Sequence, residues 1–538
     1  MKLITEASTE KLRGGFYTPE KIADFILSWG FNGDNNNIDI LEPSCGDGVF
    51  LKGILKGNYK YNSLTAIEIE EEEAQKAEAI PLESNILNED FHHFFNTTDQ
   101  KFDLIIGNPP YIRYQFFDKE QQQQAAEIFA KAGLKYSKLT NAWVSFVVGS
   151  SLLLKTEGKI GFVLPAEILQ VSFAQQLRCF LSQFYNKIVI ISFEQLVFPN
   201  IQQEVVLLLC EKNTSIDHNI DHIEVRNADE LQKLDIKKLK TPQKRIDFKS
   251  NKWTFYFLDQ KEIDFLENIA QRKKIPVLGD YADVEVGITT GANDYFTVPF
   301  SIVNQYALHA FAKPMVGRSV QVNSVIFNTK DWEINKEANA KAHLLVFPDN
   351  GIKENQSAYE YIKYGEDKGI NEGYKTGIRD NWYVIPSIKK SDALFIRRNN
   401  LYPRLIVNEA QAYTTDTMHR VYLKSGTDIN ALVASYYNSL TLAFSEVCGR
   451  SHGGGVLELM PNETERILLP YNIQNGYLIN KIDFLMREQT SIEEILSVTN
   501  QIILKEHYAL TDEEINIAHS IWKKLSKRRL NRGKKKDL

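Results

Sequence analysis

The chain has 538 residues, more than one ordinary domain holds, so two or three domains are expected. Its hydrophobic content of 43% and charged content of 25% are typical of a globular protein, and no apolar run has the ~20 residues that span a bilayer. Four scattered cysteines indicate neither a disulfide framework nor a zinc site, and a net charge of −6 argues against a surface covered with nucleic acid without excluding a local site.

Helix-like and strand-like stretches alternate up to about residue 210. Patterns at 21–30 and 141–155 predict helices. Short apolar runs bounded by Gly, Pro, Asn or Asp predict strands that are buried on both faces. These runs lie at 37–43, 64–70, 102–110, 159–165 and 205–212. Such alternation predicts a doubly wound, Rossmann-like α/β domain, in which ligands bind beyond the carboxyl ends of the strands.

The pattern changes after this alternating region. A charged stretch with a proline at 236–250 predicts a linker, and residues 251–470 are richer in Tyr, Trp, Gly and short mixed segments. The last part of the chain has helical patterns and a strongly basic tail, which is either a solvated end or an arm that touches phosphate. We therefore expect domains at 1–235 and 251–470, followed by a helical segment at 471–538.

The first predicted strand runs into a glycine-containing turn that opens a helix. Gly46 and Gly48 would let the backbone approach a ligand without a Cβ in the way, although GxG alone also fits a tight strand–helix connection. Glu68 ends the next predicted strand, where a carboxylate can accept hydrogen bonds from ribose hydroxyls. Asp90 could accept from an adenine amino group while Phe91 packs on the ring. Their order predicts a nucleoside site.

A fourth motif gives the clearest chemical prediction. The apolar run at 102–107 leads into Asn108-Pro109-Pro110-Tyr111, and the two prolines stiffen the loop. The Asn108 side chain and the Pro109 carbonyl can together accept both hydrogens of a planar –NH2 group. Such acceptance frees the nitrogen lone pair to attack a sulfonium methyl group, which is catalysis by positioning and electrostatics. Tyr111 offers a flat face to a ring.

The order of these motifs resembles that of the gamma class of N6-adenine DNA methyltransferases, the TaqI-like family of restriction–modification systems. As in that class, the glycine turn precedes NPPY and a long variable region comes last. The matching segments are FYTP at 16–19 (motif X), EPSCGDGVF at 42–50 (motif I), AIEIE at 66–70 (motif II), DF at 90–91 (motif III), NPPY at 108–111 (motif IV) and VFPNIQQEVVLLL at 197–209 (motif VIII).

The resemblance implies a cofactor and roles for individual residues. The methyl donor would be S-adenosylmethionine, leaving S-adenosylhomocysteine, and no metal is needed. The residues implied at the cofactor are Thr18, Glu42, Pro43, Cys45, Gly46, Gly48, Glu68, Asp90, Phe91 and Asn108. A target adenine would be flipped out of the duplex. Asn108 and Pro109, with Pro110, would hold its N6, while Tyr111 and Phe198 stack on the base.

The second half resembles the family's target-recognition region more loosely, which implies an α+β specificity domain. Similar segments lie at 286–298, 314–320, 408–423 and 449–461, and Gly453 to Gly455 suggest a loop near a phosphate. Arginines that could reach guanine edges or phosphates, without any being assigned, are Arg318, Arg397, Arg398, Arg404 and Arg450. Double-stranded DNA is the implied partner, with a cognate restriction endonuclease or defence-system subunits as further candidates. A cytoplasmic monomer without a membrane partner is expected.

Other functions share parts of this pattern. NPPY also serves enzymes that methylate RNA guanine N2 or protein glutamine, and cytosine N4 is chemically close, because all are planar –NH2 groups. A fused nuclease domain is a further alternative. The metal-nuclease pattern of paired acids and a lysine is matched only loosely, by PD at 348–349 and EDK at 366–368. A DNA-binding specificity component without turnover is a further, non-catalytic alternative.

Overall fold

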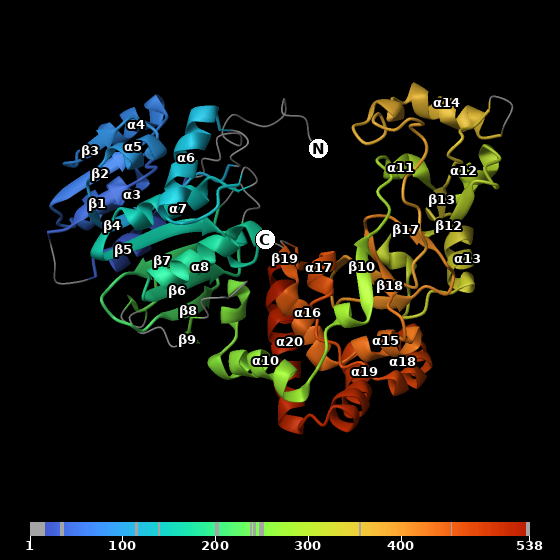
Figure 1. Cartoon of the computed structure of the whole chain (residues 1–538). Helices are drawn as coiled ribbons and strands as arrows, with labels where there is room; N and C mark the ends of the chain where they lie inside the picture. Colours follow the sequence, from blue (N-terminus) through green and yellow to red (C-terminus); the bar gives the residue numbers. More distant parts are fainter. Residues whose placement is uncertain are drawn as a thin grey trace. The chain divides into compact units, whose positions relative to one another are not determined.

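The computed structural model describes residues 17–32, 37–112, 117–137, 140–198, 204–236, 239, 244–246, 252–353, 357–452 and 454–533. The chain divides into two compact units, Met1–Ile263 and Asp264–Leu538, coloured blue to green and green to red (Figure 1). Across the described ranges, no helix combines the length and the hydropathy needed to cross a bilayer.

The first unit is built on a single nine-stranded sheet. Its spatial order is β3 (Asn85–Leu87), β2 (Ser63–Ile67), β1 (Asp39–Glu42), β4 (Phe102–Gly107), β5 (Leu154–Pro165), β7 (Val205–Glu211), β6 (Lys187–Phe193), β8 (Asn219–Val225) and β9 (Lys244–Arg245). Strands β1 to β5 are mutually parallel, whereas β7 is antiparallel to both of its neighbours. The predicted doubly wound α/β fold is confirmed by this topology.

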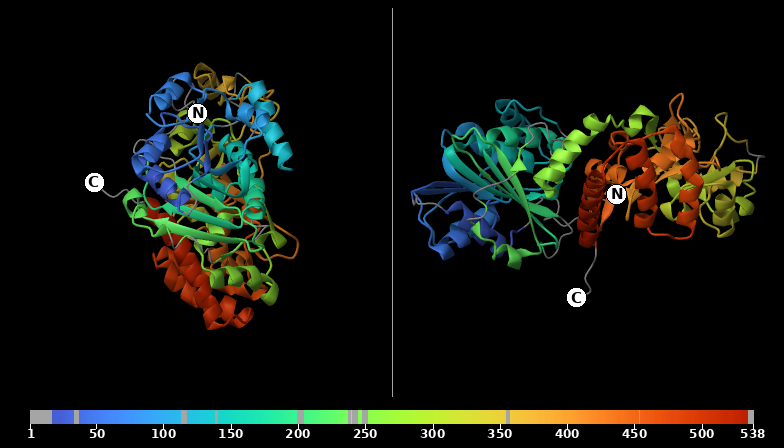
Figure 2. Two further views of the ribbon diagram at one scale, coloured as in Figure 1. Left: turned by 90° about the vertical axis from the view of Figure 1, so that its left-hand side faces the viewer. Right: turned by 90° about the horizontal axis from the view of Figure 1, so that it is seen from below.

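Helices cover both faces of this sheet (Figure 2). Helix α2 (Glu20–Gly30) contacts strands β4 and β5 and also the helices α3 (Val49–Gly57) and α9 (Ala228–Leu231). A second group comprises α5 (Phe91–Thr97), α6 (Lys119–Lys131), α7 (Trp143–Leu152) and α8 (Gln175–Phe184), while α4 (Glu71–Glu78) contacts β3. Cover on both faces explains why β1 and β4 are mostly buried, as is β5 from Ile160 to Pro165. The first part of β5 includes the exposed residues Thr156 and Glu157.

The chain order of the strands reverses at β1, which lies between β2 and β4. Connections leave β1 and β4 toward opposite sides of this point, so the loops at their carboxyl ends part and leave room for a ligand. The glycine turn follows β1, Glu68 follows β2, and Asn108 follows β4. The topology therefore brings three of the predicted motifs to one edge of the sheet.

The second unit mixes small sheets with helices, as the α+β prediction requires. One four-stranded sheet has the spatial order β10 (Ala282–Val286), β18 (Met418–Leu423), β14 (Ala393–Ile396) and β16 (Leu405–Val407). A second has the order β11 (Thr297–Val298), β13 (His343–Leu345), β12 (Ala312–Val316) and β17 (Tyr413–Thr414). A three-stranded sheet has the order β15 (Arg398–Asn399), β20 (Val456–Glu458) and β19 (Arg450–His452). Its shorter helices include α11 (Asn293–Phe296), α12 (Phe300–Gln305), α13 (Thr329–Glu337), α14 (Tyr359–Asp367) and α17 (Pro461–Thr464). Helix α10 (Gln260–Lys273) runs across the division between the units.

The predicted helical end is present and packs within this second unit. It consists of α18 (Leu478–Arg487), α19 (Ile492–Thr499), a π-helical stretch (Asn500–His507) and α20 (Asp512–Gly533). Helix α18 contacts α15 (Ile429–Tyr436), and α20 contacts α16 (Ser439–Cys448). Buried Arg529 of α20 forms an ion pair with buried Glu446 of α16 at 2.7 Å, so the last helix is fixed to the core of the unit.

Candidate functional site

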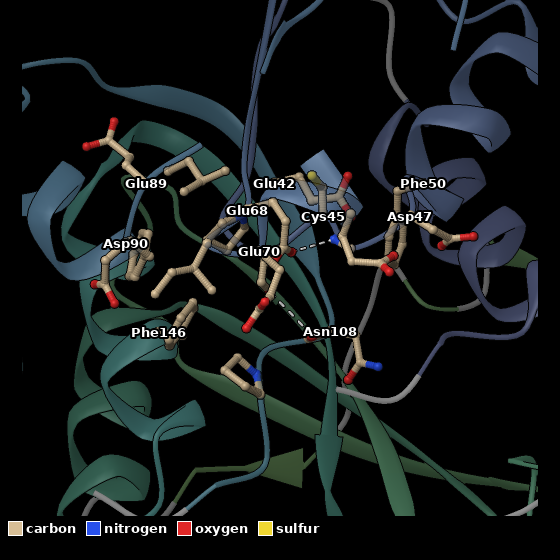
Figure 3. A pocket seen from close by; sticks show the side chains of 18 of the residues that line it. Glu42, Cys45, Asp47, Phe50, Glu68, Glu70, Glu89, Asp90, Asn108 and Phe146 are labelled. Atoms are coloured by element: carbon tan, nitrogen blue, oxygen red, sulfur yellow. Dashed lines mark hydrogen bonds between the residues drawn. The ribbon is translucent and has the colours of Figure 1, made fainter. Parts of the chain in front are cut away.

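A cavity of about 620 Å³ lies at the carboxyl ends of β1, β2 and β4 (Figure 3). The site residues that the sequence predicted and that line this cavity are Thr18, Glu42, Pro43, Cys45, Gly46, Glu68, Asp90, Phe91, Asn108 and Pro110. Its volume lies within the range of about 300–1,000 Å³ that is usual for small-molecule sites. Residues as far apart in the chain as Thr18 and Pro110 thus form one site. The predicted residues that do not line it are Gly48, Pro109, Tyr111 and Phe198.

The turn after β1 is shaped by hydrogen bonds to its backbone. The Cys45 N–H donates to the carbonyl of Ile67 on β2 at 2.9 Å, and the Gly46 N–H donates to Glu68 Oε2 at 2.8 Å. Gly46 has a φ of +51°, and a Cβ added there would meet nothing within 4 Å. The turn therefore presents an open backbone surface to the cavity, as predicted for a close approach by a ligand.

Gly48, two residues further along the turn, is packed against apolar side chains. Its φ is +80°, and an added Cβ would lie 2.5 Å from Ile80 Cδ1 and 3.1 Å from Leu51 Cδ1. The missing Cβ makes room for apolar neighbours in the fold, and Gly48 does not line the cavity. A role of Gly48 at the cofactor stays a prediction.

A pair of substitutions separates these two glycines. Both Gly46→Ala and Gly48→Ala place alanine in a left-handed conformation, at a cost of ~1–2 kcal/mol. Gly48→Ala must also displace Ile80, which adds ~1–3 kcal/mol of overpacking. We expect urea unfolding to show a larger loss of unfolding free energy for Gly48→Ala than for Gly46→Ala. Equal losses would contradict the assignment of Gly48 to packing.

Two glutamates give the cavity an acidic floor. Glu42 is 1% exposed, and its Oε2 has no hydrogen-bond partner among the described residues. Burial, together with the charges of Glu68 and Asp47, raises the pKa of Glu42 well above its usual value. Burial also raises the pKa of Glu68, although its Oε1 accepts from the Glu70 N–H at 3.0 Å. Glu42 is therefore a buried carboxyl group that a cationic ligand would stabilise.

Cys45 is buried beside this acidic floor. Burial raises the pKa of its thiol, and the neighbouring carboxylates of Glu42 and Glu68 raise it further. The thiol therefore stays protonated, and because only the thiolate is a strong nucleophile, Cys45 acts here as a small apolar lining residue.

Asp90 caps helix α5 and is held by two neighbours. His92 donates to Asp90 Oδ1 from its backbone N–H at 2.6 Å and from Nδ1 at 2.8 Å, and Gln121 donates to Oδ2 at 2.9 Å. Burial alone would raise the pKa of Asp90, but these hydrogen bonds and the charge of His92 outweigh it and lower the pKa to about 2. Asp90 is thus ionised at the rim of the cavity. Its contact with an adenine amino group stays a prediction.

An aromatic pair closes the same end of the cavity. The rings of Phe91 and Phe146 stack with centroids 4.7 Å apart, and both residues line the cavity. Phe146 belongs to α7 and is absent from the sequence-based set, because a phenylalanine in an apolar helix has the same signature as any core residue. Together the two rings offer an apolar wall to a planar ligand.

The NPPY segment leaves β4 with its side chains in two environments. The backbone carbonyl of Asn108 accepts from Ser44 Oγ at 3.3 Å, and Asn108 Oδ1 accepts from the Tyr111 hydroxyl at 2.7 Å. The same hydroxyl lies 3.1 Å from the Val163 carbonyl oxygen on β5. Tyr111 packs against the apolar core of the unit, so the link to Asn108 fixes the orientation of that amide.

Phe198 lies in the apolar core of the first unit and is 4% exposed. Residues 199–203 of the predicted motif VIII, like Phe16 and Gly453, lie outside the described residues, whereas 205–209 belong to strand β7. Stacking of Phe198 on a flipped base stays a prediction. Within the described part of the chain, no group of three His, Cys, Asp or Glu side chains could hold a metal ion.

Comparison with known proteins identifies the family. The model of the Eco57I restriction–modification methylase matches residues 47–198, which contain the NPPY segment. The model of the C-terminal domain of the type II methyltransferase M.Eco57I matches residues 250–504. The chain belongs to the type II methyltransferases of restriction–modification systems.

Relatives of this methyltransferase match it along most of its length. The type II methyltransferase M.AccI of Acinetobacter calcoaceticus is 27% identical over 470 residues, which are 84% of each chain. M.XamI of Xanthomonas campestris pv. amaranthicola is 20% identical over 85% of each chain. Among solved structures, the complex of DrdV with DNA has a TM-score of 0.48 and 13% identity, and the match covers 91% of this chain and 57% of that one.

Proposed function

We propose that the protein is a site-specific DNA methyltransferase that transfers a methyl group from S-adenosylmethionine to adenine N6. The observation that carries this proposal is the placement of Asn108 in the wall of the acidic cavity, at the end of β4. Membership of the restriction–modification methyltransferases supports methyl transfer to DNA. Adenine is favoured over cytosine because Asn, rather than Ser or Thr, precedes Pro109-Pro110-Tyr111.

The lining of the cavity fits S-adenosylmethionine group by group. Buried Glu42 offers an oxygen without a hydrogen-bond partner, which suits the α-ammonium of the methionine part. Glu68 accepts one backbone N–H at each carboxylate oxygen, and each oxygen keeps a second lone pair for a ribose hydroxyl. The wall formed by Phe91 and Phe146 suits the adenine ring. When bound, the cofactor supplies a methyl group on a positively charged sulfur.

The protein's own contribution is to prepare an acceptor for the target amino group. Asn108 Oδ1 and the Pro109 carbonyl would accept the two hydrogens of N6 and direct its lone pair toward the cavity. The Tyr111 hydroxyl already holds Asn108 Oδ1 at 2.7 Å, so the amide is oriented before a base arrives. The adenine must leave the duplex to reach this point, and Tyr111 and Phe198 are the proposed stacking partners.

The remaining parts of the chain receive roles within this proposal. Residues 1–235 form the catalytic domain, 251–470 recognise the target sequence, and 471–538 form a helical segment. The protein acts in the cytoplasm on duplex DNA as a monomer, and a cognate restriction endonuclease or defence-system subunit is its proposed functional partner.

Methyl transfer from labelled S-adenosylmethionine to duplex DNA of mixed sequence tests the proposal. Digestion to nucleosides and mass spectrometry should then give N6-methyladenine. N4-methylcytosine would overturn the choice of base and keep the role of Asn108. Label in RNA guanine or protein glutamine, and none in DNA, would overturn the choice of substrate. Cofactor binding without transfer to any of these would favour a specificity component.

A further inference from the structure

A three-stranded sheet in the second unit gathers positive side chains on one face. The register places Arg398 of β15 and Arg450 of β19 directly opposite Glu458 of the central strand β20. Directly opposed residues of an antiparallel pair point to the same face, and so does His452, two residues beyond Arg450 on β19. The other face carries Leu457, which is 1% exposed and belongs to the interior. We call Arg398, Arg450 and His452 the cationic face.

Carboxylates fix the cations of this face. Glu458 is 6% exposed, and its oxygens accept from Arg398 Nε at 3.0 Å and from His452 Nε2 at 2.9 Å. Arg450 donates from Nε to Glu463 at 2.9 Å. Burial would raise the pKa of Glu458, but the charge of Arg397 and the bonds to its neighbours outweigh this and lower the pKa, so Glu458 is ionised and can hold the Arg398 guanidinium.

The way in which Arg398 is held leaves its terminal nitrogens available. Its side chain is 66% exposed, and the hydrogen bond to Glu458 uses Nε alone. Arg404 contrasts with it, because both terminal nitrogens of Arg404 donate to backbone carbonyls, of Val322 at 2.8 Å and Ser319 at 2.9 Å. Arg404 therefore holds the fold together, whereas Arg398 presents an oriented guanidinium to solvent.

Helix α20 fixes the position of this sheet through hydrogen bonds to its backbone. Buried Arg529 of α20 donates to the carbonyls of Asn400, which follows β15, and Gly455, which precedes β20. Helix α20 also contacts β20. The hairpin between β19 and β20 includes Gly454 with a φ of +83°, where an added Cβ would meet nothing within 4 Å. The sheet is thus fixed while its hairpin offers bare backbone.

We propose that the cationic face contacts duplex DNA, with Arg398 as its principal contact. This inference rests on the proposed function, for which it supplies part of the recognition surface. An oriented guanidinium with two available terminal nitrogens matches two phosphate oxygens, or O6 and N7 of guanine in the major groove. The open backbone at Gly454 allows a sugar–phosphate strand to come close. These features select Arg398, Arg450 and His452 from the many charged residues of the unit.

Arg398→Ala and His452→Ala test the inference, because both side chains are exposed and their removal spares the core. Lys505→Ala is the matched control, since Lys505 is an exposed cation paired with Asp512 outside the sheet. Affinity for duplex DNA is measured by fluorescence anisotropy over a series of salt concentrations, and cofactor affinity by calorimetry. Arg398→Ala should weaken DNA binding on the order of tenfold, with a smaller loss for His452→Ala. Lys505→Ala should bind as the wild type does.

The salt dependence shows which DNA group Arg398 contacts. If it binds phosphate, the loss is uniform across sequences and the slope of log affinity against log salt falls by about 0.9. If it binds guanine, the loss is confined to the recognised sequence and discrimination at one position relaxes. Wild-type affinity and slope in both sheet variants would overturn the inference. A wild-type protein that binds cofactor but no duplex DNA would instead overturn the proposed function.

Discussion

Replacing Asn108 with alanine is expected to lower the rate of methyl transfer to duplex DNA by about 10²- to 10³-fold. That loss is typical when a preoriented polar group at a reacting centre is removed. The Asn108 side chain is the acceptor that the Tyr111 hydroxyl holds at 2.7 Å, and alanine leaves that hydroxyl with the Val163 carbonyl as its acceptor. The amino group of the target base would then lose one of its two acceptors, so its lone pair would be less directed.

Cofactor affinity separates this role from a general loss of structure. Glu42 and Glu68 are unaffected by the substitution, so calorimetric binding of S-adenosylmethionine to Asn108→Ala should remain close to that of the wild type. Asn85→Ala is the control, because Asn85 is exposed on edge strand β3 of the same sheet, and it should methylate DNA normally. An equal loss of transfer and of cofactor affinity in Asn108→Ala would assign Asn108 to the cofactor instead.

Much of the catalytic fold is predictable because buried parallel strands leave a strong sequence signal. Strands β1, β2 and β4 overlap predicted apolar runs bounded by turn residues. Strand β5 contains the predicted run at 159–165 but begins at Leu154, inside the 141–155 pattern that predicts a helix, because helix α7 ends at Leu152. Strand direction leaves no such signal: VVLLLCE of β7 is apolar in either direction, and the structure shows that it runs antiparallel. Strand β8 is partly exposed and mixes charged with apolar residues, which explains why the sequence pattern does not reveal it.

The candidate site was predictable where short polar motifs follow strand ends. Glu42, Glu68 and Asn108 meet in one cavity because three neighbouring strands end at the same edge. The sequence could not distinguish Gly46 from Gly48, since the difference depends on Ile80 of a distant segment. Nor could it reveal Phe146, or the contact of Gln121 with Asp90, because such partners are set by packing between helices.

Glu42→Gln is expected to make the ligand-free protein more stable and to weaken cofactor binding. A buried carboxylate with one oxygen, Glu42 Oε2, that lacks a hydrogen-bond partner among the described residues destabilises the fold, and a neutral amide of the same shape reduces that cost by ~1–3 kcal/mol. The same amide cannot form an ion pair with the ammonium of S-adenosylmethionine, so its dissociation constant should rise ~10- to 100-fold. Thermal unfolding with and without cofactor measures both effects.

The effect of Glu42→Gln on folding stability should depend on pH. Because the folded-state pKa of Glu42 is raised, its protonated form favours folding, and that stability is lost as pH rises through the raised pKa. The stability gained by Glu42→Gln should therefore be present at neutral pH and vanish below the ordinary pKa of a glutamic acid. The affinity of the wild type for the cofactor should fall as pH falls through the raised pKa of Glu42, because the protonated carboxyl group no longer attracts the ammonium. In Glu42→Gln the affinity should fall less over the same pH range.

Glu71→Gln supplies the matched control, because Glu71 is exposed on α4 and does not line the cavity. It should change neither the stability of the ligand-free protein nor its affinity for the cofactor. A Glu42→Gln variant that is less stable than the wild type at neutral pH would mean that the Glu42 carboxylate already has a partner that stabilises the fold. If it also bound S-adenosylmethionine with unchanged affinity, the ammonium group would have to be held by another of the acidic residues that line the cavity.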